Sequence, residues 1–73
     1  MDEQSLKDLL ARENEEFLKV INDHQTCERE LEALKRKFPV TEADALAERA
    51  LKKRKLVLKD RMYQMMQDYE KTL

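Results

Sequence analysis

The stretch Phe38-Pro39-Val40-Thr41 interrupts a chain of 73 residues that contains no glycine and only this one proline. Proline lacks an amide donor and clashes with the preceding helical turn, so a helix that reaches this point must end. Thr41 can cap a new helix through its hydroxyl, with Asp44 in the reciprocal position of a capping box. The sequence therefore predicts an all-α fold, a single-domain two-helix antiparallel hairpin, with helices at about 6–37 and 42–71 joined by a turn at 38–41.

Composition points to exposed helices and away from catalysis. Charged residues make up 42% of the chain and aromatic residues 5%, which is typical of long solvated helices. We expect a chain this short to enclose no substrate cavity in its own core, and it has no glycine-rich phosphate loop and no catalytic triad spacing. We expect a noncatalytic protein without a cofactor. Because a thin hairpin buries little surface, we also expect a homodimer or higher homo-oligomer.

The chain offers no targeting or membrane signal. It begins with the acidic Met1-Asp2-Glu3, and no apolar run approaches the roughly 20 residues of a membrane span. Cys27 is the single cysteine, so an internal disulfide is excluded. We expect a cytoplasmic protein that makes no membrane contact and keeps Cys27 reduced.

The first half carries a seven-residue repeat, as in coiled coils. Its two core positions are occupied by Leu10, Phe17, His24, Leu31 and Phe38, and by Leu6, Glu13, Val20, Cys27 and Leu34. Ser5 is predicted to cap this helix. His24 should face the turn of the second helix near residues 51–55, where it forms a register-setting polar layer with Arg54. A metal site made by His24 with Cys27 and Glu28 is the weaker alternative, because zinc needs about four placed ligands.

The second helix has more apolar surface than a two-helix seam requires. One stripe faces the first helix and contains Met62 and Met65, one of which should contact Phe17. Five further residues lie outside that stripe and are predicted to form an oligomer interface, in a four-helix bundle of two hairpins: Leu46, Ala50, Leu56, Tyr63 and Met66. The alternative is that long lysine and arginine stems cover this excess.

Charge is divided between the two halves. Residues 1–34 contain ten acidic and four basic residues, a net of −6, whereas residues 35–73 contain six acidic and eleven basic residues, a net of +5. An antiparallel hairpin places these opposite charges side by side. The pattern favours antiparallel over in-register parallel pairing, although each exposed pair contributes little to stability.

The basic part of the second helix carries a family resemblance. Residues 51–62 read Leu-Lys-Lys-Arg-Lys-Leu-Val-Leu-Lys-Asp-Arg-Met. This run resembles the Leu-Lys-Lys-x-Lys-Leu-x-Leu-Lys-Asp-x-(Met/Ile) signature of the YdcH-like family of small bacterial coiled-coil proteins, which have a domain of unknown function. Upstream, residues 14–17, His24 and residues 28–31 look like the first helix of that family. Several relatives have a longer, glycine-containing loop at residues 38–41. The resemblance implies a helical hairpin and no established activity.

From these patterns we predict a small coiled-coil interaction or adaptor protein that binds an unidentified protein partner. The alternative is a nucleic-acid-associated factor that neutralises phosphates through the basic run, with contacts from Lys52, Lys53, Lys55 and Lys59. Against this alternative, the sequence pI is 5.8 and no aromatic residues alternate with the bases to stack on nucleotides.

Overall fold

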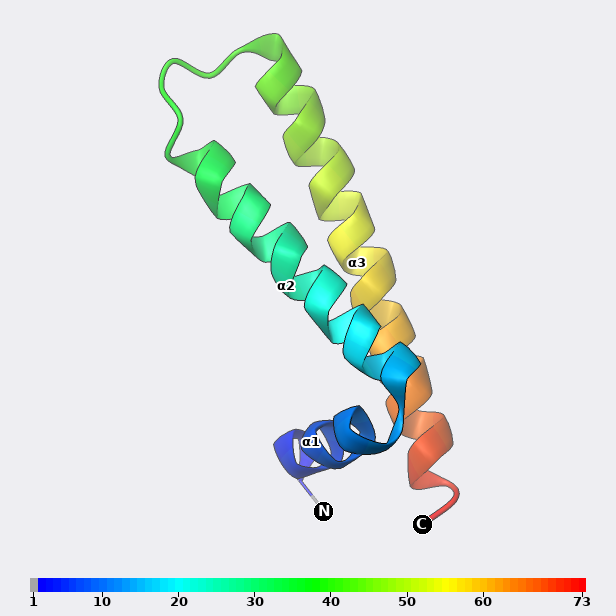
Figure 1. Ribbon diagram of the computed structural model, residues 1–73. Helices are drawn as coiled ribbons and strands as arrows, with labels where there is room; N and C mark the ends of the chain where they lie inside the picture. The colour runs from blue at the N-terminus through cyan, green and yellow to red at the C-terminus, as the bar shows by residue number, and fades with distance from the viewer. Residues whose placement is uncertain (1) are drawn as a thin grey trace.

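The computed structural model describes residues 2–73 as an all-α chain with three helices. Helix α1 spans Glu3–Glu13, α2 spans Glu15–Lys35 and α3 spans Glu42–Glu70. Helices α2 and α3 run antiparallel as a hairpin, and α1 lies across the end of the hairpin opposite the loop, so both chain ends lie at that end (Figure 1). The molecule measures 50 × 20 × 16 Å along its principal axes. The predicted antiparallel hairpin is confirmed.

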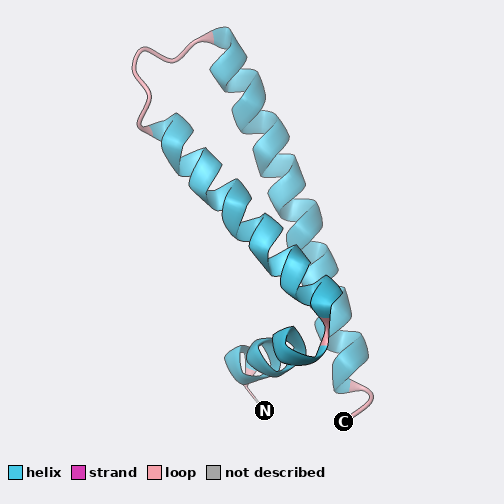
Figure 2. Cartoon of the chain, viewed as in Figure 1, coloured by secondary structure: helices cyan, strands magenta, loops and turns pink. Residues whose placement is uncertain are grey.

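The prediction of one continuous first helix is wrong, because the chain bends at Asn14. Asn14 has extended backbone angles of φ −132° and ψ 107°. Its backbone N–H donates to the carbonyl of Leu10, which closes α1, and its side-chain oxygen accepts from the backbone N–H of Phe17 at 3.1 Å, which opens α2. Asparagine is among the best N-cap residues because its short side chain reaches the free amides of the first turn. The short break is visible between the two helices in Figure 2.

Helix α1 also starts earlier than predicted. Asp2 is its N-cap, since the carboxylate of Asp2 accepts a hydrogen bond of 2.7 Å from the backbone N–H of Ser5. This contact holds the pKa of Asp2 below its usual range. Ser5 therefore lies inside the first turn and donates to the cap, and it does not serve as the cap itself.

The bend converts a two-helix seam into a small three-helix core. Leu6 and Leu10 of α1 pack in one cluster with residues of both hairpin helices, which are Phe17, Val20, Met62 and Met66. Phe17 is 0% exposed, which a two-helix contact alone does not achieve for so large a side chain. Met65 packs against the same cluster. The predicted contact of Phe17 with the methionines of the second helix is confirmed.

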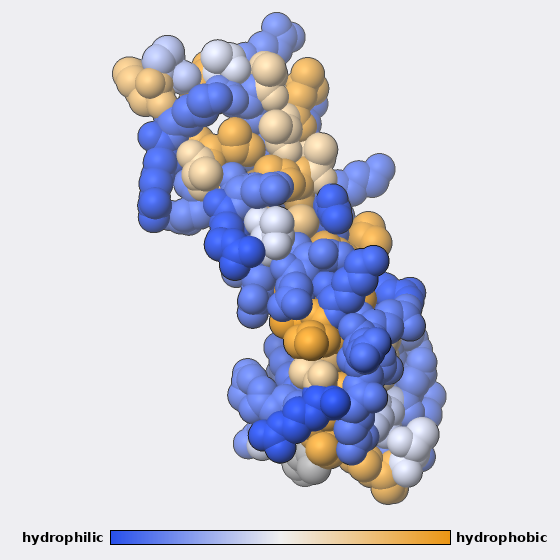
Figure 3. Space-filling view, viewed as in Figure 1, coloured by the Kyte–Doolittle hydropathy of each residue, from blue (hydrophilic) through white to orange (hydrophobic). Residues whose placement is uncertain are grey.

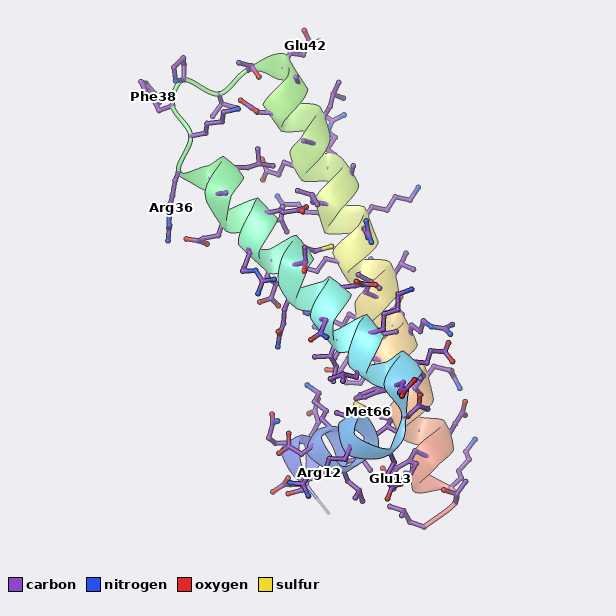
Figure 4. The ribbon with its side chains drawn as sticks, in the orientation of Figure 1. Arg12, Glu13, Arg36, Phe38, Glu42 and Met66 are labelled. Carbon is purple, nitrogen blue, oxygen red and sulfur yellow. The ribbon has the colours of Figure 1, made fainter. Side chains whose placement is uncertain are left out.

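The loop end of the hairpin is held by polar contacts. Thr41 and Asp44 form the predicted capping box at the start of α3. The Lys37 ammonium donates to the Asp44 carboxylate at 2.9 Å, and the Phe38–Pro39 peptide bond is cis. The Thr41 amide, with Lys37 beside it, holds the pKa of Asp44 below its usual range. Phe38 is 94% exposed and points away from the helices (Figure 4), so its predicted place in the heptad core is wrong.

Packing is denser at the α1 end than at the loop end. Helices α2 and α3 lie farther apart toward the loop (Figure 1), where Cys27 and Leu31 are the buried apolar residues on α2. On the first half of α3, Asp44 is the buried residue, and the apolar residues there are partly or fully exposed. The hairpin thus leaves apolar surface uncovered on α3. Within residues 2–73, no helix combines the length and apolar character needed to cross a membrane.

Candidate interaction surfaces

The predicted oligomer interface divides into exposed and buried residues. Leu46 and Leu56 are each 60% exposed, Tyr63 is 43% exposed and Ala50 is also exposed. Met66 is only 5% exposed and packs with Leu6 and Leu10 of α1. Figure 4 shows Met66 on α3 beside α1. The placement of Met66 outside the intramolecular core is therefore wrong, because α1 covers this residue with Leu6 and Leu10 after the bend at Asn14.

The exposed residues of α3 include a regular apolar stripe. Ala43, Leu46, Ala50 and Val57 are spaced by three, four and seven positions and are all exposed. At 3.6 residues per turn they fall within an arc of about 60° on the side of α3 away from its buried residues. We call these four residues the outer stripe. Leu46 is 60% and Val57 59% exposed, so half or more of each side chain contacts solvent.

The face of the molecule seen in Figure 3 is mostly polar. In Figure 3, apolar residues gather toward the loop end and in a band beside α1, within a largely hydrophilic surface. Exposed apolar side chains at helical spacing differ from scattered ones, because they can be covered together by one partner helix. The outer stripe therefore has the form of a helix-docking face.

The lysines of the basic run have two different environments. Lys52 is exposed and lies 2.8 Å from Glu48 one turn earlier, and this contact lowers the pKa of Glu48. Lys53 and Lys59 are exposed. Lys55 is half-buried, and its ammonium lies 3.8 Å from Glu28 of α2. The structure therefore directs Lys55 toward α2 and leaves Lys52 and Lys53 on the solvated side.

The polar layer beside His24 has other members than the sequence predicts. His24 Nδ1 lies 3.3 Å from the Glu28 carboxylate, and the same carboxylate faces Lys55. Arg54 is exposed and makes no ion pair or hydrogen bond within the part of the chain that the structure describes. His24 lines one cavity with Lys55 and Lys59 of α3, and Arg54 is not among the lining residues.

Two contacts tie the amino-terminal part of the chain to α3. Arg61 pairs with Glu16 of α2, and the hydroxyl of Tyr69 donates to the Glu13 carboxylate at the end of α1. The neighbouring carboxylate raises the pKa of Tyr69 above its usual value of 10.0. Both contacts join residues more than 40 positions apart in the sequence. They therefore form only when the first two helices pack against α3.

The weaker alternative for His24 is a metal site with Cys27 and Glu28. Cys27 is a free thiol that is 2% exposed. Among the described residues 2–73, no group of three or more His, Cys, Asp or Glu side chains is placed to hold a metal ion.

A family model described as "Protein of unknown function (DUF465)" matches residues 17–66. The chain belongs to the DUF465 family. This is the YdcH-like family that the basic run resembles, so the sequence-based assignment is confirmed. The match covers most of α2 and α3 and does not include α1. No curated protein and no solved structure matches the chain.

The sequence patterns missed the contribution of α1. Lys7 comes close to residues of α2 and α3 around one cavity, and neither the heptad repeat nor the charge split indicates this approach. Asn14 is the only signal that could have predicted it, because an asparagine followed by Glu15 and Glu16 can start a helix as well as continue one.

Proposed function

We propose that this DUF465 protein is a noncatalytic interaction module that associates with a second copy of itself through the outer stripe of α3. The exposure of Leu46 and Val57 on one face of a helix carries the proposal. Covering two such side chains on each copy removes apolar surface from water at roughly 25 cal/mol per Å². The alanines of the stripe, Ala43 and Ala50, let two helix backbones approach closely.

The charge distribution supports a second copy as the partner. The first 34 residues carry a net charge of −6 and the remainder +5. Two basic α3 helices brought together repel each other unless acidic residues lie nearby. The acidic α2 of each hairpin supplies them when two hairpins form a four-helix arrangement.

The shape of the isolated chain favours the same conclusion. Its apolar cluster lies at the α1 end, and the loop end has few buried residues. Small domains with so little core are commonly stabilised by association. A second hairpin laid along α3 would cover the loop-end half, where the chain itself provides no third helix.

Sedimentation equilibrium over a range of concentrations tests this proposal. We expect the wild type to dimerise at high micromolar concentration and the variants Leu46→Glu and Val57→Glu to sediment as monomers. Leu18→Glu is the matched control, because Leu18 is an exposed apolar residue on α2, away from the stripe, and is 43% exposed. A wild type that stays monomeric at high micromolar concentration, or a control that dissociates as fully as Val57→Glu, contradicts the proposal.

A second candidate function is phosphate-backbone binding by the solvated part of the basic run. It is favoured by Lys53 and Arg54, which are exposed and have no ion-pair partner within residues 2–73. Contacts with about three phosphates predict a fall in affinity of about 40-fold between 50 and 200 mM salt. A gel-shift series with labelled RNA and duplex DNA checks this, with Lys53→Gln and Arg54→Gln weakening every sequence alike.

A further inference from the structure

A cavity of about 150 Å³ lies where the three helices meet. Three lysines line it, Lys7 from α1 and Lys55 and Lys59 from adjacent turns of α3. Its apolar lining comes from α3, where Met62 and Met66 are buried and Tyr63 is partly exposed. The cavity therefore joins a cationic side to an apolar side.

The ammonium groups keep their hydrogen-bonding capacity. Lys7 lies 3.6 Å from Glu3, and Lys55 lies 3.8 Å from Glu28. Both separations exceed the 2.7–3.2 Å of an ordinary N–H···O hydrogen bond. Lys59 makes no ion pair with any residue from 2 to 73. With Glu28 as the one carboxylate on its lining, the cavity has an excess of positive charge.

His24 supplies a second, independent sign of a missing partner. The imidazole lines the cavity, and its Nδ1 contacts Glu28 at 3.3 Å. Its Nε2 is buried and has no hydrogen-bond partner among the described residues. Buried polar atoms nearly always have a partner, and the unpaired Nε2 belongs to the imidazole that lines this cavity.

We propose that this cavity binds a small anion with an apolar body of benzene size, a carboxylate or phosphate monoester. The anionic group accepts hydrogen bonds from the three lysines. The apolar body lies against Met62 and Met66. A protein cavity of about 150 Å³ holds one benzene molecule, so the volume matches the apolar body, and the anionic group extends beyond it toward the lysines.

This site differs from the nucleic-acid alternative. It uses Lys7 of α1, which lies outside the residues matched by the family model, and it does not use Lys52 or Lys53. It is also separate from the outer stripe, so its test does not depend on self-association.

Titration of the full-length protein with phenyl phosphate, followed by NMR, tests the proposal. His24 is the only histidine, so its imidazole signal is an unambiguous reporter. We expect saturable shifts of that signal and of the Met62 and Met66 methyl signals. Benzoate, with the other head group, is expected to shift the same signals. Inorganic phosphate and benzyl alcohol each lack one half of the ligand and are expected to bind at least tenfold more weakly.

Variants separate the site from general charge effects. Lys7→Gln and Lys59→Gln are each expected to weaken phenyl phosphate binding about tenfold, because each loses a charge-assisted hydrogen bond. Lys52→Gln is the matched control and should change nothing, since Lys52 is exposed and paired with Glu48 outside the cavity. Glu28→Gln should tighten binding, because it removes the one negative charge and keeps an oxygen for His24. Circular dichroism verifies the fold of each variant.

Several outcomes overturn the proposal. The absence of a saturable His24 shift with both phenyl phosphate and benzoate excludes the site. Equal binding of benzyl alcohol excludes the role of the lysines, and equal binding of inorganic phosphate excludes the role of the apolar lining. A loss with Lys52→Gln as large as that with Lys7→Gln shows unspecific attraction by the basic surface.

Discussion

Replacing Phe17 with alanine is expected to remove a large part of the stability of this protein. Phe17 is 0% exposed and lies in the only apolar cluster that unites all three helices within residues 2–73. Truncating a buried phenylalanine to alanine costs about 3–5 kcal/mol, since apolar burial is lost and a cavity remains. A domain of this length has a free energy of unfolding of roughly 4–11 kcal/mol. The variant should therefore lose a quarter or more of its stability, and it unfolds at room temperature if the wild type lies near the lower end of this range.

Urea unfolding followed by circular dichroism at 222 nm measures this loss. Leu18→Ala is the control, because Leu18 is the neighbouring residue on the same helix but is 43% exposed; it should lose less than about 1 kcal/mol. Phe17→Leu should fall between the two, since leucine fills part of the space. Measurement at two protein concentrations separates the loss of core packing from any shift in self-association.

The result that refutes the reasoning is a small or unselective effect. If Phe17→Ala loses less than about 1 kcal/mol, or no more than Leu18→Ala, then the three-helix core is not the main source of stability. A selective loss that is the same at both concentrations locates the effect within the single chain.

Three further predictions concern the cap, the loop and the basic run. Asn14→Ala should lower the free energy of unfolding by about 1 kcal/mol, because the amide of Phe17 loses its acceptor, whereas Asn14→Asp keeps an accepting oxygen; a gain in stability for Asn14→Ala would favour the straight helix. Because the pKa of Asp44 is lowered in the folded state, the contribution of its carboxylate to the free energy of unfolding is complete above the usual pKa of 3.8 and is lost as the pH falls through the lower folded-state pKa. Asp44→Asn should therefore make stability depend less on pH in thermal melts between pH 2 and 5. An unchanged slope counts against this. The last prediction concerns Lys52, Lys53 and Lys59. Changing all three to glutamine should alter the free energy of unfolding, measured by urea unfolding, by at most about 1 kcal/mol, because exposed ion pairs contribute little. A larger loss shows that these charges are structural.

The buried residues show how far the seven-residue pattern reaches. Every buried apolar residue of α1 and α2 occupies a predicted core position of the heptad: Leu6, Leu10, Phe17, Val20, Cys27 and Leu31. Side-chain direction on a helix depends on residue spacing alone, so the face that turns inward can be predicted from the sequence. The pattern fails at Phe38, because that residue lies beyond the end of α2 in the loop.

The candidate sites were predictable only in part. Leu46 and Ala50 are exposed on α3 as a docking face requires, since they lie opposite the side that faces α2. The sequence pattern places Met66 on the outer surface, whereas Met66 is buried, and it gives Lys7 no place in a site. Both differences have one cause, because the pattern predicts a straight first helix through Asn14.

Local chemistry in the sequence determined the helix starts and the hairpin. Pro39 ends one helix, Thr41 with Asp44 starts the next, and the charge division favours antiparallel pairing; each effect acts between residues a few positions apart or between whole halves. Only the tertiary structure decided the bend at Asn14. The N-cap contact of Asn14 contributes only about 1 kcal/mol, so local chemistry alone does not settle whether the helix breaks there. The burial of Leu6 and Leu10 against Met66 decides it, because apolar burial over several side chains exceeds that contribution.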